Sequence, residues 1–232
     1  MRHQETARRG LPRGDIVTPR FAAALFDVDG TLLDSTEYVM GAIEHVLRTH
    51  GRTPPPRPQI GRILGPALAD CYRVLAPDMD PSPLVAAHRA WQKERVRTLP
   101  VLPYPRAIET LVTLRAAGVR CAAVTARSKV SSLGTLDAAG FGGLLEVVLS
   151  AEDTPRTKPY PDPLLLALKL MELTPDRAVF VGDTEADILA GRAAGMTTVG
   201  VTYGFFGKAI AACRPDHLIG DIAELTSLLL DV

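Results

Sequence analysis

The chain has 232 residues, 47% hydrophobic and 22% charged, which is enough apolar material for a substantial core and unlike the composition of a disordered chain. Lysine plus arginine and aspartate plus glutamate number 26 each, so no global charge attracts nucleic acid or an anionic membrane surface. Because no apolar stretch approaches the roughly 20 residues that span a bilayer, and the N-terminus lacks the apolar core of a signal peptide, we expect a cytoplasmic protein with neither nucleic acid nor membrane as partner.

Residues 1–20 form an arginine-rich N-terminal segment. The segment holds five arginines, two glycines and two prolines, and it shows neither the helical nor the strand period. We therefore predict a loose tail, because such a segment buries too little apolar surface to fix its conformation. A basic arm that binds an acidic partner is the alternative interpretation.

The first apolar run, residues 21–26, ends abruptly at Asp27, Asp29 and Gly30. Its length and composition are typical of a buried parallel strand, whose carboxyl end is the edge of an α/β sheet where ligands bind. Two carboxylates about 5 Å apart repel each other by about 3 kcal/mol at an effective dielectric constant of about 20, so the fold should supply a cation, a proton or diverging side chains. A hard divalent metal ion is the natural candidate, whereas a solvated turn is the alternative interpretation.

The next part of the chain predicts helices only. Apolar residues recur at helical spacing over residues 36–50, after which Gly51 and three prolines break the pattern. Proline breaks then separate three further predicted helices, at residues 59–64, 66–75 and 82–96. No strand pattern occurs between residues 36 and 100. We therefore predict an all-helical cap over residues 35–100, inserted into an α/β chain.

From residue 105 onward, helical and strand patterns alternate. Strands are predicted at residues 119–124, 146–149, 178–181, 197–201 and 217–219, and helices at residues 105–117, 128–139, 163–171, 183–194 and 222–230. Alternation of this kind implies a parallel sheet with right-handed crossovers. The predicted fold is therefore α/β, with a doubly wound parallel sheet formed by residues 21–34 and 101–232.

Thr125 follows the predicted strand 119–124 as Asp27 follows the first strand, which brings a hydroxyl group to the same sheet edge. The chain then opens a helix, and a hydroxyl beside the free amides of a helix start can hold a phosphate group. A threonine that only caps the helix is the alternative interpretation.

Lys158 lies in a loop that contains Pro159, Pro161 and Pro163 and leads into a helix. A lysine held in such a stiff loop offers a fixed positive charge to a phosphate group or to clustered carboxylates. The alternative interpretation is a lysine that points into solvent, as most lysines do.

Two further acids, Asp183 and Asp187, follow the predicted strand 178–181 and Gly182. Asp183 is predicted to cap the following helix, and Asp187 would lie one turn later on the same face. Both acids would then point to the edge that carries Asp27. One capping acid and one surface acid is the alternative interpretation.

The string Asp27-Val28-Asp29-Gly30-Thr31-Leu32, followed by Asp34 and Ser35, resembles the first motif of the haloacid dehalogenase (HAD) superfamily, in the phosphatase branch with an α-helical cap of the C1 type. Thr125 matches the second motif, although Ala126 and Arg127 after it fit less closely. Lys158 with its proline-rich loop resembles the third motif, and the Gly-Asp-x-x-x-Asp string that ends at Asp187 resembles the fourth. The motifs occur in the family's order, and the resemblance extends from residue 21 to the end of the chain.

The resemblance implies a reaction mechanism. Asp27 would attack phosphorus to form an aspartyl-phosphate, and Asp29 would protonate the leaving alcohol and then take a proton from the hydrolytic water. Positive charge and hydrogen-bond donors would neutralise the transferred phosphoryl group. The implied phosphate-binding residues are Val28, Asp29, Thr125, Ala126 and Lys158.

The resemblance also implies Mg²⁺ as the cofactor. The ion would take oxygen ligands from the Asp27 carboxylate, the Asp29 carbonyl group, Asp183, the phosphate and water, with Asp187 bound directly or through water. The helical cap would close over the substrate and exclude water. The cap residues expected to contact the rest of the substrate are Arg62, Gly65 and Pro66.

Within the superfamily the chain most resembles phosphoglycolate phosphatases, so we expect a monomer or homodimer that hydrolyses a small phosphate monoester of a phosphorylated metabolite. Asp29 argues against a dehalogenase, because that branch lacks the second acid. A hexose-phosphate mutase of the β-phosphoglucomutase branch stays an alternative, although this chain has Val39 and Leu68 where that branch has a histidine and an arginine. Arg62 or Arg73 could compensate for the missing arginine. A non-catalytic metal- and phosphate-binding protein is the other alternative.

Overall fold

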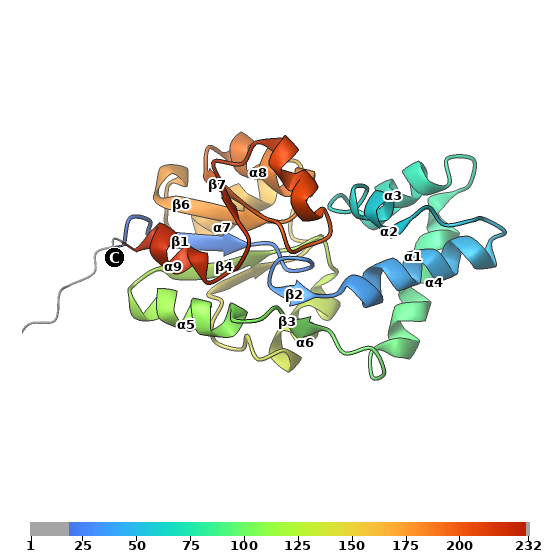
Figure 1. The fold of residues 1–232 in the computed structure, drawn as a ribbon, viewed down its shortest axis with the longest axis horizontal. Helices are drawn as coiled ribbons and strands as arrows, with labels where there is room; N and C mark the ends of the chain where they lie inside the picture. The colour runs from blue at the N-terminus through green and yellow to red at the C-terminus, as the bar shows by residue number, and fades with distance from the viewer. Residues whose placement is uncertain (1–18, 231–232) are drawn as a thin grey trace, which may run out of the picture.

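The computed structural model describes residues 19–230 (Figure 1). Most of the predicted tail, residues 1–18, lies outside the described residues. The centre of the fold is a parallel sheet of six strands in the order β5-β4-β1-β6-β7-β8. The strands are β1 (Ala23–Phe26), β4 (Arg120–Val124), β5 (Val147–Leu149), β6 (Ala178–Gly182), β7 (Thr197–Val201) and β8 (His217–Ile219). All six strands predicted from the sequence are therefore confirmed, with small shifts at their ends.

Alternate residues of β1 face opposite sides of the sheet, and helices cover both sides. Ala24 and Phe26 belong to one apolar cluster, and Ala23 and Leu25 belong to a second. The first cluster includes residues of α5 (Ala107–Ala116), α6 (Lys129–Ala138) and α9 (Glu224–Leu229), and the second includes residues of α7 (Asp162–Leu170) and α8 (Glu185–Ala194). Strands buried on both faces explain the nearly continuous apolar runs in the sequence. The doubly wound α/β fold is confirmed.

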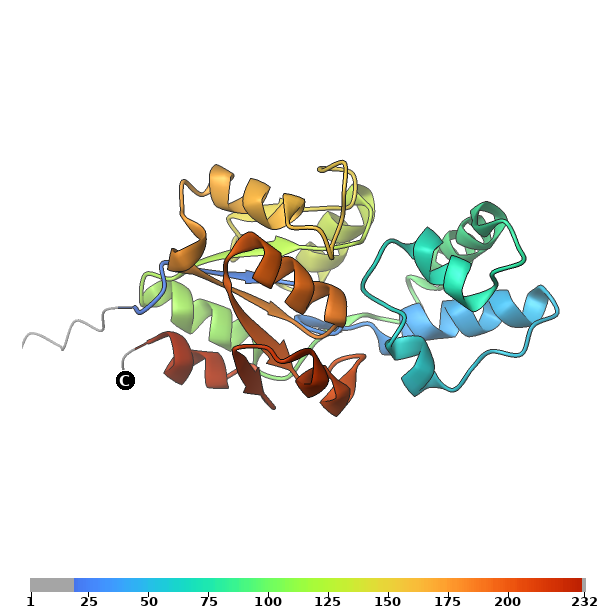
Figure 2. The same cartoon turned by 90° about the horizontal axis from the view of Figure 1, so that it is seen from above.

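Four helices form a separate group beyond the carboxyl ends of the strands (Figures 1 and 2). They are α1 (Thr36–Thr49), α2 (Arg57–Gly61), α3 (Leu68–Leu75) and α4 (Pro81–Arg95), and we call this group the cap. The cap has its own apolar cluster, in which Ile43, Tyr72 and Leu84 are fully buried. Phe205, from the segment after β7, packs against this cluster. The cap therefore has an independent core and contacts the sheet domain through that segment.

The chain passes between the sheet domain and the cap twice, and the two connecting segments lie side by side. They form a short antiparallel pair, β2 (Leu33–Asp34) and β3 (Leu102–Pro103), in which Leu33 lies opposite Pro103. The sequence did not predict this pair, because two residues are too few to show the strand period. Within residues 19–230, no helix is both long and apolar enough to cross a membrane.

Candidate active site

The central strand β1 delivers Asp27 to the edge of the sheet that faces the cap. Its backbone amide continues the parallel ladder and donates to the Val181 carbonyl oxygen at 2.9 Å, and its side chain is almost fully buried. Three residues later the chain turns at Gly30, whose φ of +86° lies in the left-handed region. The carboxylates of Asp27 and Asp29 then have different partners, Lys158 and Arg127, so the fold supplies each with its own cation.

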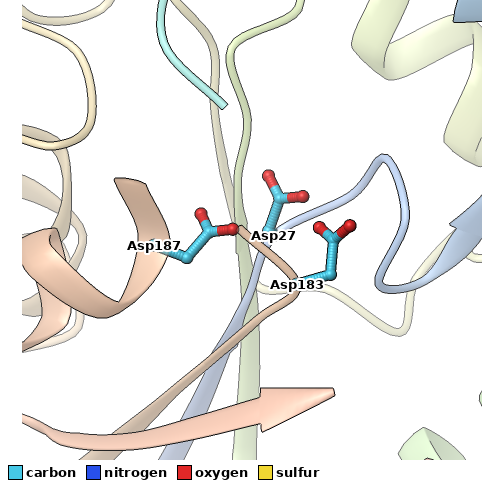
Figure 3. Close-up of side chains that lie close together, drawn as sticks. All are labelled: Asp27, Asp183 and Asp187. Atoms are coloured by element: carbon cyan, nitrogen blue, oxygen red, sulfur yellow. The ribbon is translucent and has the colours of Figure 1, made fainter. Parts of the chain in front are cut away.

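Asp27, Asp183 and Asp187 come together as one buried cluster of acids (Figure 3). One oxygen from each carboxyl group lies within 4.8 Å of the others. Burial raises the pKa of Asp27 to about 7, although the nearby Lys158 acts in the opposite direction. Burial, together with Asp27 and Asp187, also raises the pKa of Asp183 well above its usual value. The cluster therefore disfavours its full negative charge unless a cation joins it.

The end of β6 and the start of α8 position the two acids of the fourth motif. The helix begins at Glu185 with Thr184 as its N-cap, so the prediction that Asp183 caps it is wrong. β6 continues through Gly182, and Asp183 lies between the strand and the cap residue. Asp187 completes a capping box, because its Oδ2 accepts from the Thr184 amide at 3.0 Å and from the Thr184 hydroxyl at 2.6 Å. The other carboxylate oxygen of Asp187, Oδ1, takes no part in the capping box and lies 2.7 Å from Lys158 Nζ.

Lys158 is buried in contact with the acidic cluster and does not point into solvent. Its Nζ lies 2.5 Å from Asp27 Oδ1 and 2.7 Å from Asp187 Oδ1, and it donates to the Val124 carbonyl oxygen at 3.1 Å. Burial alone would lower the pKa of Lys158, but Asp187 and Asp27 offset that effect and hold the pKa above its usual value. Lys158 is therefore a fixed positive charge, as the sequence predicts.

The donor set suits a hard divalent cation such as Mg²⁺, which prefers carboxylate oxygens. Asp187 Oδ1 is buried and lies 2.7 Å from Lys158 Nζ, a cation that it shares with Asp27. One lysine also cannot neutralise three buried carboxylates. A metal ion in contact with Asp27, Asp183 and Asp187 would supply the missing positive charge.

Backbone packing fixes the position of Asp183 within the cluster. Its Oδ2 accepts from the Phe205 amide at 2.6 Å, and its Oδ1 lies 3.4 Å from the Thr31 hydroxyl. A Cβ atom at Gly30 would lie 2.2 Å from this carboxylate, and one at Gly204 would lie 2.4 Å from it. Glycine at both positions therefore lets two backbone segments approach Asp183 closely.

Hydrogen-bond donors for a phosphate group gather beside Asp27. Thr125 is buried at the end of β4, and its hydroxyl accepts from the Arg127 amide at 3.1 Å. The amides of Val28, Asp29 and Ala126 donate to no acceptor within residues 19–230. The Val28 side chain itself lies in the core, so only its backbone faces the site. The Thr125 hydroxyl and these amides line the place where the sequence predicts a phosphate cradle, and phosphate binding there stays a prediction.

Arg127 is a site residue that sequence analysis missed. Its Nε and Nη2 each lie 2.6 Å from an oxygen of Asp29, and its Nη1 donates to Thr135 at 3.0 Å and to Ser131 at 3.3 Å. Burial alone would raise the pKa of Asp29, but the ion pair with Arg127 offsets this effect and the pKa lies below its usual value. The fork geometry of an arginine suits this paired contact with a carboxylate.

This arrangement matches a known family. A family model described as haloacid dehalogenase-like hydrolase matches residues 24–201 of the chain. The chain belongs to the haloacid dehalogenase-like hydrolase family. All four motifs compared with that family in the sequence fall within the matched span.

Individual relatives agree with this assignment. The pyrophosphatase PpaX of Bacillus pumilus is 31% identical over 206 residues, which are 88% of this chain and 94% of that protein. A crystal structure of a predicted phosphoglycolate phosphatase from Haemophilus somnus has a TM-score of 0.79 and 25% identity, and covers 90% of this chain and 97% of its own. A haloacid dehalogenase-like hydrolase from Bacteroides fragilis has a TM-score of 0.80 and 26% identity, with 89% and 100% covered. The prediction of an HAD-type phosphatase is confirmed.

A cavity of about 550 Å³ separates the catalytic edge of this HAD enzyme from its cap. Asp27, Asp29 and Thr125 line it from the sheet domain, and Gly65 and Pro66, two of the predicted cap contacts, line it from the cap. The third predicted contact, Arg62, instead lines a different hollow between α2 and the segment after β7. The sequence did not indicate the contribution of α4 and its C-cap residue, which line the cavity with His88, Arg89, Gln92, Lys93 and Val96.

Proposed function

We propose that this HAD-type phosphatase requires Mg²⁺ and hydrolyses a small phosphate monoester through an aspartyl-phosphate on Asp27, as its likeness to phosphoglycolate phosphatases suggests. The observation that carries the proposal is that two sets of groups gather around Asp27. One set is Asp183, Asp187 and Lys158, and the other is the Thr125 hydroxyl with the free amides at the ends of β1 and β4. A phosphate held between them has its phosphorus beside the Asp27 carboxylate.

The chain's own residues have distinct parts in the proposed reaction. Asp27 forms a bond to phosphorus while the bond from phosphorus to the leaving oxygen breaks. Lys158, the Thr125 hydroxyl and the backbone amides stabilise the charge on the phosphoryl oxygens. When bound at the acidic cluster, Mg²⁺ would add a Lewis acid that orients the phosphate and neutralises its charge.

Asp29 is the proposed proton carrier of the reaction. Asp29 lines the cavity between the sheet domain and the cap, where the leaving group would lie. It would give a proton to the leaving oxygen and later take one from the water that hydrolyses the aspartyl-phosphate. In the arrangement with Arg127 the carboxylate form is favoured, which suits the second of these two steps.

Pyrophosphate hydrolysis is a second candidate function. It is favoured by the 31% identity to a protein named pyrophosphatase PpaX, which extends over 88% of this chain. Asp27 would attack one phosphorus atom of a diphosphate, and the other phosphate group would be the leaving group. The same residues would therefore serve both candidate reactions.

The mutase alternative receives less support. Val39 and Leu68 line the cavity at the positions where a mutase would carry its histidine and arginine. Arg62 lines the other hollow, and Arg73 is exposed and paired with Asp70 on α3. Neither arginine is therefore placed to compensate. Formation of glucose 6-phosphate from β-glucose 1-phosphate and a bisphosphate primer, faster than release of free phosphate, would favour the mutase.

Removal of metal is expected to abolish turnover. We expect no hydrolysis of para-nitrophenyl phosphate in excess chelator, recovery with Mg²⁺ and inhibition by Ca²⁺, because Ca²⁺ takes more ligands at longer distances and misplaces the nucleophile. The measurement is the steady-state rate of nitrophenol release against metal concentration. Full activity in excess chelator would contradict the metal requirement, and no activity under any metal condition would favour a non-catalytic binding protein.

Gly204→Ala is expected to weaken Mg²⁺ activation and to lower activity at least about tenfold, because displacement of a catalytic group by about 1 Å can reduce a rate by about 100-fold. The added Cβ atom would lie 2.3 Å from the Gly30 carbonyl oxygen and 2.4 Å from the Asp183 side chain. The readout is the Mg²⁺ concentration for half-maximal activity. Gly134→Ala on α6 is the matched control, because a Cβ atom there meets nothing within 4 Å. Equal Mg²⁺ dependence in both variants would show that Gly204 does not help to hold Asp183.

A further inference from the structure

Phe205, in the segment after β7, contacts the acidic cluster with its backbone and the cap with its side chain. Its amide donates to Asp183 Oδ2 at 2.6 Å, and its side chain packs against the apolar cluster of the cap. Phe205 also lines both hollows that lie between the cap and the sheet domain. One residue therefore joins the core of the cap to a carboxyl group that is proposed to bind metal.

The last residue of α2 rests on the backbone of the same segment. A Cβ atom at Gly61 would lie 2.3 Å from the Phe205 carbonyl oxygen, so only glycine lets the cap approach this closely. On the sheet domain, the Tyr203 hydroxyl donates to the Thr31 carbonyl oxygen at 3.0 Å. The segment is therefore held between α2 and the loop that follows β1, and a displacement of α2 would move the Phe205 amide.

A second contact of the cap lies on the residue that holds Asp187. Gly65, between α2 and α3, has a φ of +116°, and a Cβ atom there would lie 2.6 Å from the Thr184 hydroxyl oxygen. The Thr184 hydroxyl donates to Asp187 Oδ2 at 2.6 Å, and Thr184 is buried. Residues 61–65 of the cap therefore touch both Phe205 and Thr184, each of which holds a carboxyl group of the acidic cluster.

Asp183 depends on such support more than the other two acids of the cluster. Lys158 pairs with both of the others, whereas Asp183 forms no ion pair within residues 19–230. Its hydrogen-bond partners are the Phe205 amide and, at 3.4 Å, the Thr31 hydroxyl. Without metal, repulsion by the neighbouring carboxylates acts against these two contacts. The position of Asp183 therefore depends on where the cap holds the segment.

We propose that Phe205 is a positioning residue that couples the seating of the cap to metal binding at the acidic cluster, with Thr184 as a second point of contact. The inference rests on the proposed function and adds a regulation of the same site. A carboxyl group that is held in place before the ion arrives loses less freedom on binding, so the seated cap raises the affinity for a divalent cation. Coupling between two sites is reciprocal, so the bound ion also favours the seated cap.

The test measures Mg²⁺ binding in the absence of substrate, by isothermal titration calorimetry. Phe205→Ala keeps the backbone amide but removes the side chain from the cap, and Phe205→Leu keeps an apolar contact. Gly61→Ala pushes α2 away from the segment without changing the segment itself. Phe206→Ala is the matched control, because Phe206 is the next residue of the segment but lies outside the apolar cluster of the cap.

We expect Phe205→Ala to raise the Kd for Mg²⁺ at least about fivefold, the lower end of common couplings between two sites, and Phe205→Leu to raise it less. Gly61→Ala should also raise the Kd, and this variant decides the question if Phe205→Ala fails to fold. Phe206→Ala should leave the Kd unchanged.

Hydrogen exchange measures the reciprocal effect of the ion on the cap. In the wild type, the amides of residues 57–66, which include α2 and both contact glycines, should exchange more slowly with Mg²⁺ than in chelator. This difference should shrink in Phe205→Ala, whereas a role confined to cap stability would change exchange equally with and without the ion.

Equal Mg²⁺ affinity in wild type, Phe205→Ala and Gly61→Ala, or cap exchange that does not respond to Mg²⁺, would overturn the coupling and leave the proposed function intact. A wild-type protein that neither binds Mg²⁺ nor hydrolyses para-nitrophenyl phosphate in its presence would refute the proposed function, and the coupling with it.

Discussion

Asp27→Asn is expected to lower turnover at least about 10³-fold, because an amide cannot form the aspartyl-phosphate and loss of a nucleophile removes most of an enzyme's rate enhancement. The fold should persist. Asparagine is nearly isosteric with aspartate, and it removes one of the buried carboxylates whose charges repel each other. Steady-state phosphate release from a purified variant measures the effect.

Asp137→Asn is the matched control for this experiment. Asp137 is exposed on α6 and lies outside the cavity lining, so wild-type activity is expected. Circular dichroism should show equal secondary structure in both variants. If a contaminant-free Asp27→Asn preparation kept more than a few per cent of the wild-type rate, Asp27 would not be the nucleophile.

Lys158→Met is expected to destabilise the metal-free protein by about 3–5 kcal/mol, because loss of one partner of a buried ion pair leaves uncompensated buried charge. Here the side chain is 3% exposed, and its removal would leave Asp27 and Asp187 without their cation. Turnover should also fall at least about 100-fold, since Lys158 is a preorganised charge beside the nucleophile. Both effects follow from the same contacts.

Chemical denaturation in chelator and in Mg²⁺ measures the effect of Lys158→Met on stability. Mg²⁺ should restore part of the loss, because the ion brings positive charge to the same carboxylates. Lys169→Met, at an exposed position on α7, is the control and should change stability by less than about 0.5 kcal/mol. Equal stability of Lys158→Met and wild type in chelator would mean that the lysine does not hold the cluster together.

The features predicted from the sequence are those set by periodicity. The apolar run before Asp27 marks a central strand, and alternation of strands and helices marks the doubly wound sheet. Because parallel strands end at one edge, their order along the chain is enough to assign Thr125 and Asp183 to the same site as Asp27. The helical cap follows equally from helical spacing without strand signals between residues 36 and 100.

The features that sequence analysis missed depend on contacts between distant segments. Local sequence favours Asp183 as the helix cap because aspartate is a common N-cap residue, but Thr184 is the cap and leaves Asp183 for the cluster. The pair of Asp29 with Arg127 joins residues 98 positions apart, and no local pattern indicates it. Phe205 contacts Asp183 through its backbone amide. A backbone contact of this kind does not depend on the amino-acid type, so the sequence does not indicate it. Short loops acquire such geometry from tertiary packing.

The central claim is that Asp27 carries the phosphoryl group during turnover. The direct measurement is peptide mass spectrometry of enzyme quenched with acid while it turns over substrate in the presence of Mg²⁺. We predict a peptide containing Asp27 with the added mass of one phosphoryl group, which neutral hydroxylamine removes and which is absent in Asp27→Asn. Phosphate release without any such peptide, or a phosphoryl group found on a different residue, would contradict the claim.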